Sequence, residues 1–234
     1  MNFDTNASLP LVEMFETIEG EGSAAGKQTT FIRLFHCNLR CVWCDTTYSY
    51  APSKPEFEAT IEEIAEKVRC LGNHYVCLTG GEPLIHGEKS MALIDRLAKI
   101  DCIQDIHVET NGAILLKPFI NMRRLSTIIS NKVRFIMDFK LPDSGEMKKM
   151  VYENFDLLDE QDEIKFVIGT EHDFNIAMEI IDKHYKKGRL LMSPVWETMT
   201  PADLVKKVLN SRRKDIQVNL QIHKIIWDPQ TRGV

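Results

Sequence analysis

The chain has 234 residues, of which 44% are hydrophobic and 27% charged, and its formal net charge is −5. This is a globular composition, and its acidic balance argues against a broad basic surface for nucleic acid. Six cysteines in a chain of this length do not indicate a small secreted disulfide protein, and Cys70, Cys77 and Cys102 are expected in the apolar core. No signal segment or bilayer-length apolar run is visible, so we expect a single cytoplasmic domain over residues 1–234, away from any membrane.

Strands and helices alternate along the chain. Strands are predicted at 11–17, 30–36, 75–79, 106–109, 134–140, 163–168, 189–193 and 218–223. Helices with one apolar face are predicted from Thr60, over 90–99 and 173–185, and from Pro201. This alternation predicts repeated βαβ units, with a parallel sheet inside and helices outside. With about six such units instead of the eight of a closed barrel, we expect an α/β fold, an open partial (β/α)6-type barrel.

Unusual residues cluster where the predicted strands end. These stretches are 37–44, 79–83, 109–112, 138–140 and 193–196. In barrel-like α/β folds the carboxyl ends of the strands meet on one face, and active sites form there. We therefore expect these five stretches to line one mouth.

The first of them carries three cysteines, in the pattern Cys37-x3-Cys41-x2-Cys44. A closed structural zinc site takes four protein ligands, whereas a cluster of four irons held by three thiolates keeps one iron open. Two interpretations follow from the spacing, an iron–sulfur cluster with a free iron or a zinc site in which His36 is the fourth ligand.

With Trp43 before the last cysteine, this motif resembles the cluster signature of radical S-adenosylmethionine (SAM) enzymes. The resemblance implies that the open iron binds SAM and that one electron cleaves it to a 5′-deoxyadenosyl radical. Thr79-Gly80-Gly81-Glu82-Pro83 resembles the GGEP motif of the same superfamily, which holds the SAM amino group. Standing alone, it is also compatible with a plain tight turn.

Further stretches narrow the resemblance to the 7-carboxy-7-deazaguanine synthases of the queuosine pathway. They are Phe15-Glu-Thr-Ile-Glu-Gly-Glu-Gly22, Phe31-Ile-Arg33, Asp45-Thr46, Ser193-Pro194 and Gln221-Ile-His-Lys224. The family resemblance implies a radical ring contraction of 6-carboxy-5,6,7,8-tetrahydropterin to 7-carboxy-7-deazaguanine, with loss of ammonia. It also implies a homodimer, and an electron donor such as flavodoxin or ferredoxin.

The resemblance assigns the site residues. The [4Fe-4S] cluster would be bound by Cys37, Cys41 and Cys44, and a Mg²⁺ ion by Thr46, whose hydroxyl is a hard oxygen ligand. SAM would be bound by Trp43, Cys44, Asp45, Gly81, Glu82, Glu109, Asp138, Phe139, Lys140, Ser193, Pro194, Val195 and Trp196. The pterin would be bound by Ile18, Glu19, Gly20, Arg33 and Thr79, the arginine through its planar fork of donors.

Some positions allow a second interpretation or depart from the family. Glu109 is equally compatible with a ribose-binding acid and a polar turn, and Asp138 with Lys140 is compatible with a surface ion pair. Glu19 stands where many members have Gln, and Asp138-Phe139 where many have Ser-Pro. Two other functions stay open, a glycyl-radical enzyme activating protein and a zinc-binding module without catalysis.

Overall fold

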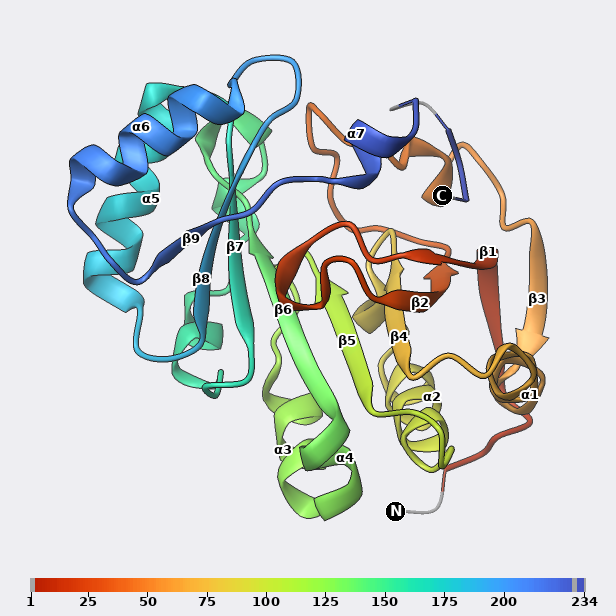
Figure 1. The fold of residues 1–234 in the computed structure, drawn as a ribbon. Helices are drawn as coiled ribbons and strands as arrows, with labels where there is room; N and C mark the ends of the chain where they lie inside the picture. The colour runs from red at the N-terminus through yellow and green to blue at the C-terminus, as the bar shows by residue number, and fades with distance from the viewer. Residues whose placement is uncertain (1–2, 229–230, 234) are drawn as a thin grey trace.

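The computed structural model describes residues 3–228 and 231–233, and its strands form one nine-stranded sheet in the order β3-β1-β2-β4-β5-β6-β7-β8-β9 (Figure 1). The strands are β1 (Ser8–Ile18), β2 (Gln28–Leu34), β3 (Phe57–Thr60), β4 (Tyr75–Gly80), β5 (Asp105–Thr110), β6 (Val133–Phe139), β7 (Glu163–Ile168), β8 (Arg189–Pro194) and β9 (Ile216–Val218). From β2 across to β9 the neighbours pair in parallel, whereas β1 pairs antiparallel with both β2 and β3. The predicted partial barrel with a largely parallel sheet is confirmed.

The longer helices cover the outer face of this curved sheet, and the turn between β1 and β2 lies in front of its inner face (Figure 1). The helices are α1 (Ile61–Leu71), α2 (Glu88–Ala98), α3 (Lys117–Leu125), α4 (Thr127–Lys132), α5 (Glu171–His184), α6 (Pro201–Ser211) and α7 (His223–Ile226). The predicted capping box at Thr60 is present, because its hydroxyl accepts from the Glu63 N–H while the Glu63 carboxylate accepts from the Thr60 N–H. No helix in the described ranges is long and apolar enough to cross a membrane.

Side chains alternate between the two faces of the strands, as the period of two requires. The outward positions join the apolar core under the helices, and they include Val76, Leu78, Ile106, Val108, Phe135, Met137, Ile164 and Phe166. The inward positions carry mostly polar or charged side chains, and they include Cys77, Thr79, His107, Glu109, Arg134, Asp138, Glu163 and Lys165. Parallel strands covered on both faces usually read as continuous apolar runs, so this polar row marks the inner face as the place for chemistry.

Two expectations from the sequence were wrong. The strand expected at 218–223 is Ile216–Val218 instead, after which the chain turns into the short helix α7. Cys70 is exposed and Cys102 half-buried, so Cys77 alone of these three is fully buried. Cys70 falls outside the buried stripe of α1, which ends with Val68.

Candidate active site

The three motif cysteines lie in the loop that follows β2. The Cys44 N–H donates to the Cys41 oxygen at 3.2 Å, which folds the last turn of the motif onto itself. The Cys37 sulfur accepts from the Leu39 N–H at 3.4 Å and from the Asn111 side-chain amide at 3.7 Å. Amide donors aimed at sulfur favour its thiolate form, so a side chain at the end of β5 supports a cluster ligand.

The loop is anchored to the segment after β6. The Arg40 N–H donates to the Glu146 carboxylate at 2.5 Å, and the Val42 N–H donates to the Ser144 oxygen at 3.1 Å. Glu146 is 6% exposed, so the bond at Arg40 is shielded from water. These two bonds fix the main chain between Cys37 and Cys44 to the segment after β6.

The three thiols are not gathered as closely as the ligands of a single zinc ion would be. Four ligands around one zinc place sulfurs about 3.8 Å apart, since Zn–S bonds are about 2.3 Å long. Within the described residues, Cys37, Cys41 and Cys44 form no group with His36 whose ligand atoms all lie within 4.8 Å of one another. A cluster of four irons binds each thiolate at a different corner and separates its ligands more widely.

The charge around the cysteines also bears on a metal site. Burial raises the pKa of the Cys41 thiol to about 11, while the Lys140 ammonium acts in the opposite direction. Burial likewise raises the pKa of Cys37. Thiols with raised pKa values lose their protons when a cationic metal centre binds, and Lys140 adds a second positive charge to the same place.

The glycines of the GGEP stretch are needed for a close approach to the cysteine loop. A Cβ on Gly81 would lie 2.2 Å from the main-chain oxygen of His36 and 2.8 Å from the Cβ of Cys37. A Cβ on Gly80 would lie 2.3 Å from the oxygen of Leu34. The stretch is therefore the surface on which the cysteine loop rests, which the interpretation as a plain turn did not foresee.

The Glu82 side chain connects the ends of β4 and β5 through buried hydrogen bonds. Its fully buried carboxylate accepts from the Leu84 N–H at 3.0 Å, the Thr110 hydroxyl at 3.0 Å and the Asn111 N–H at 2.6 Å. Burial raises the pKa of Glu82 to about 7, although these donors act in the opposite direction. The side chain is thus directed into the protein, where it fixes the end of β5.

Across the next strands, Arg33, Thr79 and Glu109 stand side by side on the inner face. Arg33 of β2 is in register with Thr79 of β4, whose hydroxyl donates to the Glu109 carboxylate of β5 at 2.8 Å. Arg33 also donates through Nε to Glu13 at 2.7 Å. Glu109 lies within a strand and not in a turn, and burial raises its pKa.

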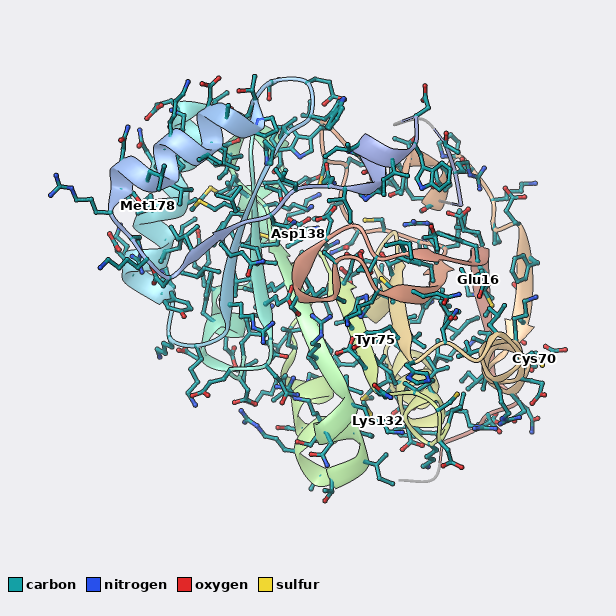
Figure 2. The ribbon with its side chains drawn as sticks, viewed as in Figure 1. Glu16, Cys70, Tyr75, Lys132, Asp138 and Met178 are labelled. Carbon is teal, nitrogen blue, oxygen red and sulfur yellow. The ribbon has the colours of Figure 1, made fainter. Side chains whose placement is uncertain are left out.

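Asp138 and Lys140 continue this row at the end of β6, where Figure 2 labels Asp138. Asp138 Oδ2 lies 2.8 Å from Lys140 Nζ and 3.6 Å from Nζ of Lys165, its neighbour on β7. Their side chains are 11–18% exposed, which excludes a surface ion pair. Asp138 Oδ1 is buried, and no described group hydrogen-bonds to it. A buried carboxylate oxygen of this kind is open to a donor on a bound molecule.

The turn between β1 and β2 meets the end of the chain inside the barrel. Glu21 accepts from Lys165 at 3.0 Å and from the Gln221 side chain at 2.6 Å. The Gly22 N–H donates to the Asn219 oxygen at 2.7 Å, and the Asn219 amide donates to the Ser193 hydroxyl at 2.8 Å. This turn and the segment after β9 are thus bonded to each other beside the inner face of the sheet.

Two of the residues assigned to metal and SAM binding lie directly beside the cysteines. The Thr46 hydroxyl lies 3.7 Å from the Cys44 sulfur, and Asp45 is exposed, with Lys224 Nζ 3.5 Å from its carboxylate. Because these residues are neighbours in the sequence, their oxygen and sulfur groups also lie close together in the structure.

Other assigned residues lie less centrally. The side chain of Phe139 is fully buried among Tyr152, Phe155 and Phe166, so a contact of this position with SAM would involve the main chain. Trp196 is 43% exposed. The remaining assigned residues that make no contact described above are Trp43 (half-buried), Ile18 (exposed) and Glu19, Gly20, Pro194 and Val195 (all buried).

Several polar residues on or beside the inner face were not singled out from the sequence. They are His107, Arg134, Lys165 and Asn219. A signal was available for Lys165, because Glu163 and Lys165 alternate with apolar residues within a correctly predicted strand. The inward side of the other predicted strands could have been searched in the same way.

Comparison with known proteins agrees with this site. Residues 32–206 match the model of the Radical SAM superfamily. The chain is 36% identical over 226 residues to a 7-carboxy-7-deazaguanine synthase of Clostridium acetobutylicum, covering 96% of this chain and 98% of that protein. It is 34% identical over 248 residues to the enzyme of the same name from Leptospira interrogans, covering 98% and 99%. The crystal structure of QueE from Escherichia coli superposes with a TM-score of 0.68 at 22% identity, covering 92% and 94%.

A family model that spans most of the chain and full-length relatives above 30% identity point to one group of enzymes. The cysteine motif at 37–44 and the GGEP stretch at 79–83 both lie within the residues that match the superfamily model. Neither a zinc-binding module nor a glycyl-radical activating protein agrees with this similarity. The chain is a radical SAM enzyme and belongs to the 7-carboxy-7-deazaguanine synthase family.

Proposed function

We propose that this protein converts 6-carboxy-5,6,7,8-tetrahydropterin to 7-carboxy-7-deazaguanine with loss of ammonia. The observation that carries the proposal is the turn between β1 and β2, which lies over the inner face and contacts β5, β7 and the segment after β9. Its sequence is the part that distinguishes this family from other radical SAM enzymes with the same cysteine spacing. The turn adds polar and charged groups to the inner face, since Glu21 of the turn bonds to Lys165 and Glu19 to His107.

The side of the site near the cysteines suits a cluster and SAM. Cys37, Cys41 and Cys44 would bind a [4Fe-4S] cluster, which together with SAM supplies the 5′-deoxyadenosyl radical that removes hydrogen from the pterin. The buried Asp138 Oδ1 has no donor among residues 3–228 and 231–233, so it is available to a donor group of SAM. Because Glu82 is occupied by protein donors, we assign the SAM amino group to main-chain oxygens of the GGEP stretch.

The other side of the site suits the pterin. Arg33 is held by Glu13 through Nε alone, and its remaining guanidinium donors suit a planar carboxylate or carbonyl group. Thr46 would bind a Mg²⁺ ion that also contacts the substrate carboxylate, since Mg²⁺ commonly combines few protein oxygens with substrate and water. These residues bind and orient the substrate, while the cofactor supplies the bond breaking.

The same proposal includes the partners. A flavodoxin or ferredoxin would supply the electron, and the face of the cysteine loop around Val42, which is 77% exposed, gives it access. We propose a homodimer in the cytoplasm, where reducing conditions keep the thiols available.

An anaerobic assay with SAM, reductant, Mg²⁺ and the carboxytetrahydropterin, followed by mass spectrometry, tests the function. The expected product is 7-carboxy-7-deazaguanine from the native chain and none from Cys44→Ala. Cys70→Ala, which changes an exposed cysteine outside the motif, is the matched control and should retain product formation. Absence of the deazapurine from the reconstituted native protein would overturn the proposal.

A further inference from the structure

Glu19 and His107 lie 88 positions apart in the chain and meet inside the partial barrel. Glu19 follows the last residue of β1, whereas His107 lies in the middle of β5 with its ring on the inner face. His107 Nε2 is 2.7 Å from Glu19 Oε2, and the two residues are 0% and 4% exposed. This contact joins the turn between β1 and β2 to a central strand.

The contact is an ion pair. The other ring nitrogen of His107, Nδ1, lies 2.7 Å from Asp105 Oδ1, so both nitrogens face carboxylates and both must donate. Burial and Arg134 of the neighbouring β6 lower the pKa of His107, but the bonds to Asp105 and Glu19 prevail and raise it to about 9. The imidazole therefore carries a positive charge at neutral pH.

A metal ion is a poorer explanation of the same residues. Ligand atoms of Glu19, Cys77 and His107 lie within 4.8 Å of one another, which is a spacing that a cation could use. However, the imidazolium has no free lone pair, and the guanidinium of Arg134 lies close enough to repel a cation. The Cys77 thiol is also neutral, since burial raises its pKa well above the usual value.

Every polar group of Glu19 is engaged in holding the turn. Its second carboxylate oxygen accepts from the Glu21 N–H at 3.1 Å. Its main-chain N–H donates to the Lys27 oxygen, and its main-chain oxygen accepts from the Gly26 N–H, both at 2.8 Å. Its neighbours bond to other parts of the chain, since the Gly20 oxygen accepts from the Ile222 N–H and the Glu21 carboxylate accepts from Lys165 and Gln221.

We infer that Glu19 is a positioning residue, which holds the turn between β1 and β2 on β5 through His107 and so sets the place of the turn beside the pterin. This inference rests on the proposed function for the identity of the substrate. The physical step is that a charge-assisted, buried bond fixes a loop to the strand that also carries Glu109. A glutamine at this position would keep the shape but lose the charge that the imidazolium requires.

Hydrogen–deuterium exchange of the protein without pterin tests whether the bond between Glu19 and His107 holds the turn in place. In Glu19→Gln and in His107→Gln, the amides of Glu21 and Gly26 should exchange about tenfold faster or more, because a charge-assisted bond has been weakened. Glu62→Gln, which removes one carboxylate from an ion pair with Arg96 on the outer surface, is the control and should exchange as the native protein does. Native-like exchange at these amides in the isosteric Glu19→Gln would overturn the inference.

Kinetics then separate positioning from a general structural role. In Glu19→Gln the KM for the pterin should rise about tenfold, while kcat at saturating pterin falls less than about threefold, because the turn is displaced but still intact. A fall in kcat with an unchanged KM would overturn the inference. Failure of the native protein to convert the pterin would instead refute the proposed function. The exchange experiment would still decide whether Glu19 and His107 hold the turn.

Discussion

The main-chain oxygen of His36 occupies the space that a side chain on Gly81 would need, since a Cβ there would lie 2.2 Å from it. The Glu82 N–H donates to the same oxygen at 2.6 Å, so the end of β4 and the start of the cysteine loop are packed and bonded together. The two motifs that the sequence presents 35 or so positions apart thus form one structural piece in space.

Replacing Gly81 by Ala should displace the cysteine loop. The added methyl group overlaps main-chain atoms, which cannot rotate away, and overpacking of this kind lowers the free energy of unfolding by about 1–3 kcal/mol. We expect less iron per chain after anaerobic reconstitution, measured by iron analysis and absorbance. Gly72→Ala is the control, because that glycine ends α1 with a positive φ but has no neighbour within 4 Å of an added Cβ. It should lower stability by about 1 kcal/mol and leave the iron content unchanged.

Replacing Thr46 by Ala should weaken the response to Mg²⁺ while sparing the cluster. Loss of one oxygen ligand should raise the Mg²⁺ concentration for half-maximal turnover at least about tenfold. Titration of activity with Mg²⁺ measures this, with the iron content as the second readout. Thr47→Ala, which changes the exposed residue next along the chain, should behave as the native protein does. An unchanged Mg²⁺ response in Thr46→Ala would remove this residue from the metal site.

Arg123 and Arg124 are neighbours on α3 that should differ greatly in their effect on stability. Arg123 is 2% exposed and binds Asp162, which is fully buried, through two nitrogens at 2.5 and 2.8 Å. Its replacement by Ala leaves a buried carboxylate without its charged partner and should lower the free energy of unfolding by about 3–5 kcal/mol. Arg124→Ala removes an exposed contact with Asp159 and should lower it by less than about 1 kcal/mol. Urea unfolding of both variants measures these two losses, provided that the unfolding free energy depends on urea concentration with the same slope in each.

The imidazolium of His107 should make stability depend on pH above neutrality. Its pKa is raised from 6.5 in the unfolded chain to about 9 in the folded protein. The group therefore contributes in full below pH 6.5, and about 3 kcal/mol is lost as the pH rises through 9. The charges that face it are Asp105, Glu19 and Arg134. Urea unfolding at several pH values should show this fall in the native protein and a smaller one in His107→Gln; equal slopes would contradict the assignment.

Much of the fold could be predicted from the sequence, because apolar residues recur along most strands and helices with the period of that element. The strand at 163–168 was predicted with its observed bounds, and the helix at Thr60 from its capping pattern. The segment at 218–223 was predicted wrongly because it is short, with apolar residues that a strand and a turn of helix share. Strand β3 and helix α4, of four and six residues, are too short to show a period.

The parts of the candidate site that lie in one short motif could be predicted from the sequence. The contacts between residues far apart in the chain could not. The three cysteines and Thr46 lie within ten positions, so their proximity follows from the chain itself. By contrast, the meeting of Glu19 with His107 depends on which way a long hairpin folds across the sheet, and no local pattern encodes that direction. The same is true of Asn219 and its contact with Gly22.

This last contact has a consequence for the newly made chain. Gly22 and Asn219 are separated by 197 positions, and the Ile222 N–H likewise donates to the oxygen of Gly20. The N-terminal turn leaves the ribosome early, yet its partners emerge only when translation is nearly complete. The candidate active site is therefore completed last, and a chain interrupted before Asn219 has all three cysteines without the segment that bonds to the turn between β1 and β2.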